Sequence, residues 1–415
     1  MEVRPGHKQT EVGVIPADWD VKHLGDLGLV VRGGSPRPAG DSRYFNGNFI
    51  PWLTVAALTN IPEHQLEVKD TIGFLTEEGA KRSRTLDAGT LIVANSGATL
   101  GVAKLLGVTC CANDGIAAII DQQLGEKSYI CFYINTLTKN LREVVATGNG
   151  QPNLNTALIR EIAIPFPPPP EQRAIAAALS DVDALLDGLD RLIAKKRDLK
   201  QAAMQQLLTG QTRLPGFSVE WEVRGLGDVG DIRSGGTPST TQAHFWDGDV
   251  PWCTPTDITG LRGAKYLTET ARTISVAGLQ ASSAEIIPPR SLIMTSRATI
   301  GECAINLGPM TTNQGFKNIV PCAEIDVEFL YYLMTTQKPG LVSLCGGSTF
   351  LEIGKKQLSA YEISLPKDRT EQTAIATLLS DMDAEIATLE TRREKTRLLK
   401  QGMMQELLTG RIRLV

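Results

Sequence analysis

The chain has 415 residues, of which 42% are hydrophobic and 21% charged; this length and balance predict two to four globular domains, and no apolar run is long enough to span a membrane. The formal net charge is −4 and no part of the chain has a large basic excess, so composition argues against nucleic-acid binding unless local clusters or partners supply the contacts. Seven cysteines without Cys-x-x-Cys spacing, and an N-terminus without the apolar core of a signal peptide, predict reduced thiols and a cytoplasmic protein.

Residues 1–165 predict a compact α/β domain. The apolar runs TLIVAN (90–95) and AAIID (117–121) are typical of buried or half-buried strands. The segment YICFYINTLTKNLREVVA (129–146) has the periodicity of an amphipathic helix. Gly- and Pro-rich loops join these elements, and a proline run, PFPPPP, ends the block.

Residues 166–214 predict one long helix, which the proline run keeps from starting much before Glu171. Gly210 suits a left-handed position just after the helix. About 38 residues at about 1.5 Å each give a length of roughly 57 Å. Apolar residues recur at 3- and 4-residue steps and predict a coiled-coil seam. We assign the seam to Val182, Leu185, Leu189, Leu192, Leu199 and Ala203, widened by Ile175, Leu179 and Leu186.

Residues 215–365 repeat the landmarks of the first block in the same order, but with different polar residues. EWEVRGLGDVGDIRSGGTP (220–238) is similar to DWDVKHLGDLGLVVRGGSP (18–36), and VPW, SRATIG and TNQG follow where the first block has IPW, SGATLG and ANDG. VEFLYYLMTTQKPGLVSL (327–344) predicts an amphipathic helix. Strands are predicted at SLIMTS, FKNIVP and YEISLP.

Residues 366–415 repeat the first long helix without a gap: residues 171–214 align on residues 371–414, and more than half of the aligned positions are identical. Asp368 followed by Glu371 predicts a capping pair at the start, and Gly410 a left-handed residue after the end. The helices are alike while the blocks differ. This favours helices that meet one kind of partner twice and blocks that meet two different ligands.

Two similar long helices, each with one apolar seam, pack most simply side by side and antiparallel. The sequence therefore predicts an α/β (α+β) fold: tandem recognition domains, each followed by a long helix, with the two helices forming an antiparallel coiled coil of pseudo-two-fold symmetry. Linear DNA is a ligand that two separated domains can contact at once.

Catalytic motifs are absent from the sequence. The four histidines are not spaced with Cys, Asp or Glu as a metal-ligand set, and no phosphate-binding loop, dinucleotide fingerprint or nucleophile elbow occurs. We expect no catalytic residue, no metal site and no cofactor in this chain, which favours a binding or scaffolding protein over an enzyme.

The chain resembles the specificity subunit of type I restriction-modification enzymes along its whole length. The resemblance rests on GNGQPNLNTALIREIAIPFPPPPEQRAIAAALSDVDALL (148–186) followed by LKQAAMQQLLTG, and on the second copies EQTAIATLLSDMDAEI and LKQGMMQELLTG. IPW, SGATLG, SRATIG and TNQG are similar to landmarks of the family's target-recognition domains. The second copy departs from the pattern, with LPKDRTEQ in place of the proline-rich lead and GGSTFLEIGKKQL in place of GNGQPNLNTALI.

The resemblance implies a subunit without an active site that binds double-stranded DNA at a bipartite, asymmetric target, one half-site per domain. Residues 1–165 and 215–365 would be the target-recognition domains, and residues 166–214 and 366–415 the helical spacers. Two modification subunits, which use S-adenosylmethionine to methylate adenine, would sit on the helices. Restriction subunits, which use ATP and Mg, would join them. The complex would be cytoplasmic in a prokaryote and need no membrane.

Candidate DNA contacts are exposed polar residues of the landmark loops, because arginine suits guanine, and asparagine or glutamine suits adenine. In the first block they are Arg32, Ser35, Arg37 and Arg43 around a Gly-Pro loop, then Ser96, Thr99 and Asn113, then Asn149, Gln151 and Asn153. An ordinary solvated loop remains the alternative for the first group. Structural turns remain the alternative for the second, and a helix-capping turn for the third.

The second block offers equivalent candidates. Its loop carries Arg233, Thr237 and Ser239, and Thr299 and Asn313 recur from the first block together with Ser296. Arg297 stands where the first block has Gly97, and Gln314 where it has Asp114, so these differ where base recognition should differ. Lys317, Lys355 and Lys356 are candidate phosphate contacts.

A rival hypothesis stays open at this point: a coiled-coil adaptor that joins two proteins and has no DNA affinity. A nuclease or methyltransferase with an unrecognised motif is a third.

Overall fold

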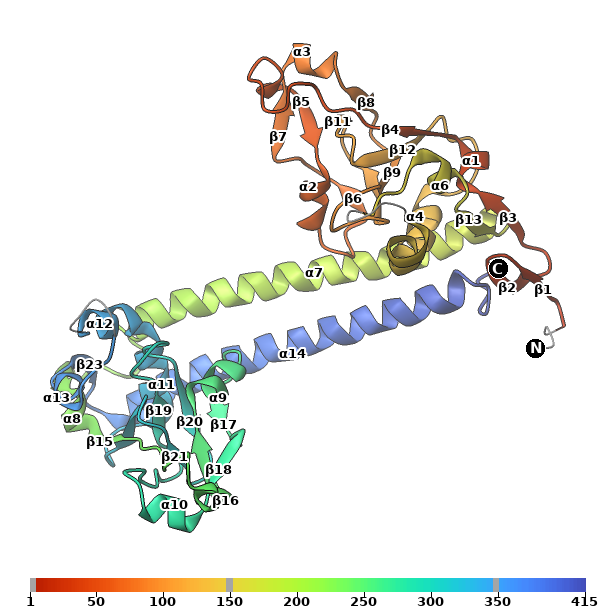
Figure 1. The fold of residues 1–415 in the computed structure, drawn as a ribbon. Coiled ribbons are helices and arrows are strands. Elements are labelled where there is room, and N and C mark those ends of the chain that lie inside the picture. The colour runs from red at the N-terminus through yellow and green to blue at the C-terminus, as the bar shows by residue number, and fades with distance from the viewer. Residues whose placement is uncertain (1–4, 147–151, 346–350) are drawn as a thin grey trace. The chain divides into compact units, whose positions relative to one another are not determined.

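The computed structural model describes residues 5–146, 152–345 and 351–415. Its contacts divide the chain into two units, one formed by Met1–Ile193 with Leu389–Val415, the other by Ala194–Thr388. Each contains one of the repeated blocks and part of both long helices, α7 (Pro169–Leu207) and α14 (Arg369–Leu407) (Figure 1). No helix in the described ranges is long and apolar enough to cross a membrane.

The block of unit 1 is built on two mixed sheets, a strand pair, a hairpin and short helices. The five-stranded sheet has the order β4 (Leu29–Arg32), β12 (Ile116–Ile120), β9 (Leu91–Ala94), β10 (Ala103–Leu106), β6 (Glu67–Val68). The four-stranded sheet has the order β7 (Gly73–Leu75), β5 (Phe45–Leu53), β11 (Cys110–Ala112), β8 (Arg84–Leu86). The remaining pairs are β1 (His7–Thr10) with β2 (Gly13–Pro16), and β13 (Ala163–Phe166) with β3 (Asp20–His23). The helices are α1 (Leu24–Leu27), α2 (Val55–Thr59), α3 (Glu77–Ala80), α4 (Lys127–Thr136), α5 (Thr138–Asn140), the π-helical η1 (Leu141–Val145) and α6 (Thr156–Arg160).

The block of unit 2 repeats this plan, with equivalent strands in the same order. Its five-stranded sheet runs β15 (Gly230–Ser234), β22 (Lys317–Pro321), β19 (Leu292–Met294), β20 (Cys303–Asn306), β17 (Tyr266–Leu267). Its second sheet runs β18 (Arg272–Ile274), β16 (Trp246–Cys253), β21 (Thr311–Thr312), and β14 (Trp221–Gly225) pairs with β23 (Glu362–Pro366). The helices are α8 (Leu226–Val229), the 3-10 turn η2 (Ala243–Phe245), α9 (Pro255–Gly260), α10 (Val276–Gln280), α11 (Val327–Thr336), α12 (Lys338–Ser343) and α13 (Lys355–Ser359).

The strands predicted from apolar runs are confirmed, and the most apolar of them, β9, is covered on both faces. In β9 every residue is buried: Leu91 and Val93 belong to the core beneath α4, and Ile92 and Ala94 to a second core on the other face. A strand buried on both sides shows a continuous apolar run rather than an alternating one.

The two amphipathic helices are right in kind and wrong in extent. The structure breaks them at residues 137 and 337, giving α4 and α5 in unit 1 and α11 and α12 in unit 2. In unit 2 the cause is Pro339 at the start of α12, since proline has no N–H to continue a helix. In unit 1 the Thr138 hydroxyl donates to the carbonyl of Asn135 at 3.1 Å, a local bond that competes with helix continuation.

The long helices pack together antiparallel, as ion pairs in unit 1 demonstrate. Lys400 on α14 lies 2.6 Å from Asp183 on α7, and Arg393, seven residues earlier, lies 3.0 Å from Asp190, seven residues later. The residue numbers of the paired positions therefore decrease along α14 as they increase along α7, so the helices run in opposite directions. The first pair is largely buried, so it also fixes the register of the two helices.

Unit 2 holds the same contact with the partners exchanged. Here Lys200 comes from α7 and Asp383 from α14, 2.5 Å apart, and Lys196 pairs with Glu385 at 2.6 Å. Each residue of the first pair has its counterpart two hundred positions away on the other helix. This exchange of partners is the contact pattern of a pseudo-two-fold helix pair.

The predicted seam is right for Leu189 and for the widening residues Ile175, Leu179 and Leu186, which are buried, and wrong for Leu185, Leu192 and Leu199. Leu185, Leu192, Leu199 and Leu399 are exposed, whereas the neighbouring stripe is buried. That stripe comprises Ile175, Leu179, Leu186, Leu189 and Ile193. Both stripes recur every seven residues, so spacing alone does not distinguish the packed one from the outer one.

One buried carboxylate holds distant parts of unit 1 together. Glu171, 1% exposed at the start of α7, accepts a hydrogen bond from the Trp19 indole at 3.0 Å and from Arg413 Nη2 at 2.7 Å. Arg413 lies beyond the end of α14 and also bonds Asp18 at 2.9 Å. The carboxylate thus joins both helices to the beginning of the block, and we call this arrangement the clasp.

The clasp recurs in unit 2, where buried Glu371 accepts from Arg213 Nη2 at 2.6 Å and from Trp221 at 3.4 Å. This corrects the predicted capping pair. Asp368 does cap α14, accepting from the Thr370 amide at 2.9 Å, but the Glu371 side chain points into the ion pair instead. Gly210 and Gly410 take the predicted left-handed conformation, with φ of 71° and 70°.

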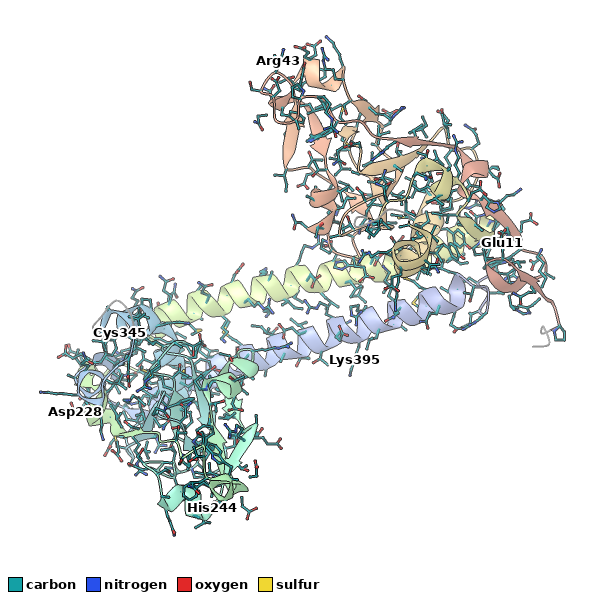
Figure 2. The ribbon with its side chains drawn as sticks, viewed as in Figure 1. Glu11, Arg43, Asp228, His244, Cys345 and Lys395 are labelled. Atoms are coloured by element: carbon teal, nitrogen blue, oxygen red, sulfur yellow. The ribbon has the colours of Figure 1, made fainter. Side chains whose placement is uncertain are left out.

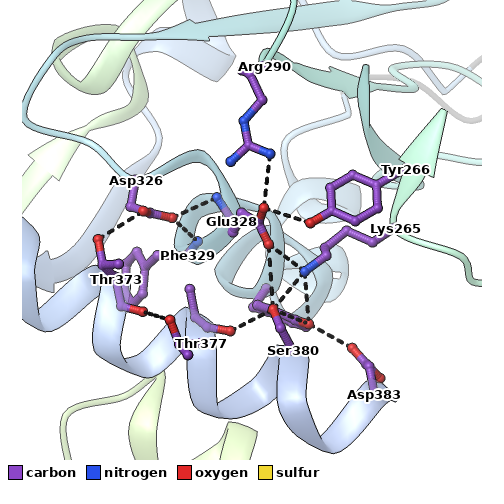
Figure 3. A network of polar contacts seen from close by, with 12 residues as sticks. Lys265, Tyr266, Arg290, Asp326, Glu328, Phe329, Thr373, Thr377, Ser380 and Asp383 are labelled. Atoms are coloured by element: carbon purple, nitrogen blue, oxygen red, sulfur yellow. Dashed lines mark hydrogen bonds and ion pairs between the residues drawn. The ribbon is translucent and has the colours of Figure 1, made fainter. Parts of the chain in front are cut away.

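A polar network fastens the block of unit 2 to α14 (Figure 3). Glu328 on α11 accepts from Lys265 at 2.5 Å, Tyr266 at 2.7 Å and Arg290 at 3.0 Å, and Lys265 also donates to Ser380 on α14 at 2.7 Å. These cationic and hydroxyl donors together lower the pKa of Glu328 against the opposing effect of burial, which itself raises it. The carboxylate therefore stays charged and anchors the block.

Loss of either clasp carboxylate should destabilise its own unit. We expect Glu171→Ala to lower the free energy of unfolding of unit 1 by roughly 2–4 kcal/mol, because a buried partner of Arg413 and Trp19 is removed. Glu371→Ala should do the same in unit 2. Urea denaturation gives the magnitude, and hydrogen exchange identifies the unit. Glu161→Ala, at an exposed site, is the control; a clasp variant no less stable than this control contradicts the expectation.

Candidate nucleic-acid interface

Three landmark segments meet at one edge of each five-stranded sheet. The Gly-Gly-Ser/Thr-Pro loop follows β4 or β15, the Asn-x-Gly turn precedes β12 or β22, and the Ser-x-Ala-Thr turn follows β9 or β19. In unit 1, Arg32 at the end of β4 pairs with Ala117, and Ile116 at the start of β12 pairs with Ala94 at the end of β9. The register therefore gathers all three segments, and we call this place the loop junction.

Glycine is required where the first two segments touch. A Cβ atom on Gly33 would lie 2.2 Å from the carbonyl oxygen of Asn113, and one on Gly235 would lie 1.9 Å from that of Asn313. Real Cβ contacts are never this short, so the backbones approach closely only without a side chain. The next residue, Gly34, donates its amide to the carbonyl of Ala112 at 2.9 Å.

Asp114 is the centre of the junction in unit 1. Its Oδ1 accepts from the Ser35 hydroxyl at 2.7 Å, Arg37 Nη2 lies 3.4 Å from its Oδ2, and Arg32 donates to its backbone carbonyl. The Ser35 hydrogen bond and, less strongly, the charges of Arg32 and Arg37 lower the pKa of Asp114, while burial raises it. The carboxylate is consequently ionised at neutral pH.

Gln314 takes the same position in unit 2. Its Oε1 accepts from the Thr237 hydroxyl, as Asp114 accepts from Ser35, and its side chain is exposed. Ser239 bonds Thr241 at 2.9 Å in the loop. Arg233 faces elsewhere, donating to Asp231 at 2.8 Å. The frame of the junction is thus shared, and its central side chain is an acid in one unit and an amide in the other.

An ion-paired group stands beside the junction in unit 2. Arg297 donates to Glu352 at 2.8 Å, and the ammonium of Lys317 lies 3.9 Å from the same carboxylate. Lys317 is buried, and burial lowers its pKa while Glu352 opposes the shift. Its ammonium faces Glu352 rather than solvent. In unit 1 the equivalent bridge joins Ser96 to Asn153, so Arg297 stands where the first block has Ser96 and not, as predicted, Gly97. The Arg142 guanidinium donates to the Ala98 carbonyl of the same turn.

Buried polar atoms without a partner among the described residues gather at both junctions. Both threonines of the Ser-x-Ala-Thr turns, Thr99 and Thr299, belong to this group. The others here are Asn95 Oδ1, Asn113 Oδ1, Ser296 Oγ, Arg297 Nε and Asn318 Oδ1. Buried polar atoms normally have partners, and enclosed water is a common one, so this group indicates buried water near the junctions.

The remaining predicted residues lie apart from these contacts. Arg43 forms a pair with Asp41, Nη2 to Oδ2 at 2.7 Å, and lies beside α3 at the outer end of its block (Figure 2). Lys355 and Lys356 are exposed at the start of α13. The predicted contacts Asn149 and Gln151 fall outside the described residues, and their neighbour Asn155 caps α6, as the capping alternative proposed.

Sequence reasoning missed the central role of Asp114, and it missed Glu352 and Asn318. The comparison of ANDG with TNQG contained the signal for Asp114. Glu352 lies in the stretch that departs from the first copy, so no repeat pointed to it. Within the described ranges, no group of three or more His, Cys, Asp or Glu residues is placed to hold a metal ion.

The family model of the type I restriction modification DNA specificity domain matches residues 16–195 and again residues 218–398. Both matches include one block and much of the helix after it.

Individual relatives and a solved structure point to the same family. The type I restriction enzyme MjaIX specificity subunit of Methanocaldococcus jannaschii is 38% identical over 184 residues, which span 44% of this chain and 41% of that protein. The MjaVIII specificity subunit of the same organism is 24% identical over 96% of this chain and 94% of its own length. A solved chain of a type I R-M system shares the fold, with a TM-score of 0.63, 19% identity and coverage of 96% of this chain and 99% of that one.

The junction glycine provides a test of the close approach. We expect Gly33→Ala to lower the free energy of unfolding by about 1–3 kcal/mol and to speed hydrogen exchange at the ends of β4 and β12, because its methyl group overlaps backbone atoms. Gly34→Ala is the matched control, since the nearest atom to its added Cβ is 4.0 Å away. Equal stability of the two variants would show that the approach is not tight.

Proposed function

Because the chain belongs to the family of type I restriction modification DNA specificity proteins, we propose that it recognises a bipartite, asymmetric DNA target within a type I restriction-modification complex. Residues 1–165 and 215–365 act as target-recognition domains, one per half-site, and residues 166–214 and 366–415 as spacers. The observation that carries this proposal is the pair of loop junctions, which share one backbone frame and differ in their central side chains.

The shared and the different parts of the junction have different roles. The parts that recur in both units are the close glycine contact and the Ser35 or Thr237 hydroxyl, and they fix the same frame for both half-sites. Side chains that differ, such as Arg37 and Gln314, suit base edges, which differ between half-sites.

The chain itself catalyses no reaction in this proposal. Two modification subunits, which bind S-adenosylmethionine and methylate adenine, sit on the helix pair, and restriction subunits that use ATP and Mg join the complex in the prokaryotic cytoplasm. Partners that also contact the duplex compensate for the net charge of −4, since much of the affinity for DNA comes from phosphate contacts.

The outer stripe of the helices supplies contacts for the modification subunits. Leu199 and Leu399 occupy equivalent positions of α7 and α14, and both are exposed, by 48% and 60%. Exposed leucines at matched positions suit one kind of apolar partner surface met twice. Nothing in the family match supports the rival adaptor, because the matching domain is a DNA specificity domain.

Sequencing of methylated DNA tests the proposed function. Cells that express this chain with its modification subunits should methylate adenine in one bipartite motif with a fixed spacer, and cells without the chain should lose that methylation. Exchange of residues 1–165 for another domain of the family should change one half of the motif only. Unchanged methylation in the absence of the chain, or a change in both halves after the exchange, would contradict the proposal.

Substitution of the outer leucines tests the docking surface. We expect Leu199→Asp and Leu399→Asp each to weaken the binding of one modification subunit by at least about tenfold, as loss of a central apolar contact does. Light scattering of the purified complex measures the loss of mass. Leu398→Asp is the control, because the equivalent residue of α7 is already Asp198. If all three variants retain two modification subunits, the outer stripe is not the docking surface.

A further inference from the structure

We propose that the middle residue of the Asn-x-Gly turn is the base-recognising centre of each loop junction, and that it suits a G·C pair in the first half-site and an A·T pair in the second. The residues are Asp114 in unit 1 and Gln314 in unit 2. This inference rests on the proposed function and assigns the base chemistry of that same site.

The side chains at the two junctions differ in a concerted way. Three positions differ together between the junctions while the backbone and the hydroxyl donor are kept. In unit 1 they hold Arg32, Arg37 and Asp114; in unit 2 they hold Ser234, Ser239 and Gln314. A charged set is thus replaced as a whole by a neutral one. Independent surface drift would not be expected to change all three positions in the same sense.

In unit 1 the geometry suits guanine. The Arg37 side chain is 73% exposed, and its guanidinium lies 3.4 Å from Asp114 Oδ2. Asp114 therefore orients the guanidinium, most of which stays exposed to solvent. A guanidinium donates two parallel hydrogen bonds to O6 and N7 of guanine. Asp114 is itself 43% exposed and accepts only, so it complements the N4 amino group of the paired cytosine.

In unit 2 the geometry suits adenine. The Thr237 hydroxyl occupies one acceptor site of Gln314 Oε1 and so fixes the amide plane. A carbonyl oxygen accepts two hydrogen bonds, and the amide nitrogen of Gln314 has no partner among the described residues. The side chain therefore retains one acceptor for N6 of adenine and donors for N7, the pair of bonds by which glutamine recognises adenine.

The two junctions also provide the design of the test. Because a hydroxyl bonds the central residue in both units, the triple variant Arg32→Ser, Arg37→Ser, Asp114→Gln should keep the frame of unit 1. The variant would place the neutral side chains of unit 2 in the domain that recognises the first half-site. The single variant Arg37→Ala alters only an exposed side chain, so it remains informative if the triple variant does not fold.

The measurement uses the full complex with its modification subunits and a library of DNA targets varied through both half-sites. We expect the triple variant to change the preference at one position of the first half-site from G·C to A·T by at least about fivefold in methylation rate, as loss of one bidentate contact predicts. Arg37→Ala should reduce discrimination at that same position. Arg160→Ala, an exposed arginine of α6, is the control and should leave the motif unchanged.

The outcomes separate this inference from the proposed function. If the wild-type complex methylates a bipartite motif and Arg37→Ala leaves every position as selective as before, the inference is wrong and the proposed function stands. A change in the second half-site would also overturn it. If the wild-type complex has no bipartite motif, the proposed function itself fails.

Discussion

Both units depend on the same constraint, a carboxylate buried at the start of one helix that must be neutralised by an arginine from beyond the end of the other. A buried charge without a partner costs several kcal/mol, so the arginine and the tryptophan indole that contact Glu171 are held in place by its need for partners. The contact joins the helix ends to the first strands of the block. Glu371 imposes the same constraint on unit 2. This explains why residues at the far ends of the helices, such as Arg213 and Arg413, belong to the repeated pattern.

Local patterns predicted what depends on local physics. The strands β9 and β12 and the bounds of the long helices could be predicted, because periodicity and flanking proline and glycine determine them. The packed face of the helices could be predicted only in part, since a buried and an exposed leucine stripe share one period. The centre of the junction could not be predicted. The bond from Ser35 to Asp114 joins residues far apart in sequence, and only the register of β4 on β12 brings them together.

If the loop junction binds DNA as proposed, its recognition can change while the fold is kept. Gly33 and Gly235 allow the same close approach of backbones, and a hydroxyl holds the turn in both units. These elements fix the position of one side chain without determining its type. Asp114 only accepts hydrogen bonds, whereas Gln314 both accepts and donates, so the two units offer different chemistry on the same frame.

The two junctions also differ in where their charged side chains lie. Unit 1 places two cations and one anion at the centre, Arg32 and Arg37 with Asp114, whereas unit 2 places two cations and one anion beside it, Arg297 and Lys317 with Glu352. In unit 1 the guanidinium groups of Arg84 and Arg142 also lie at the junction, donating to the carbonyls of Arg32 and Ala98. Phosphate responds to the sum of such charges. Bases respond to individual donors and acceptors, which differ. On the proposed function, the exchange of charged for neutral side chains at the centre therefore changes the donors and acceptors that each junction offers to base edges.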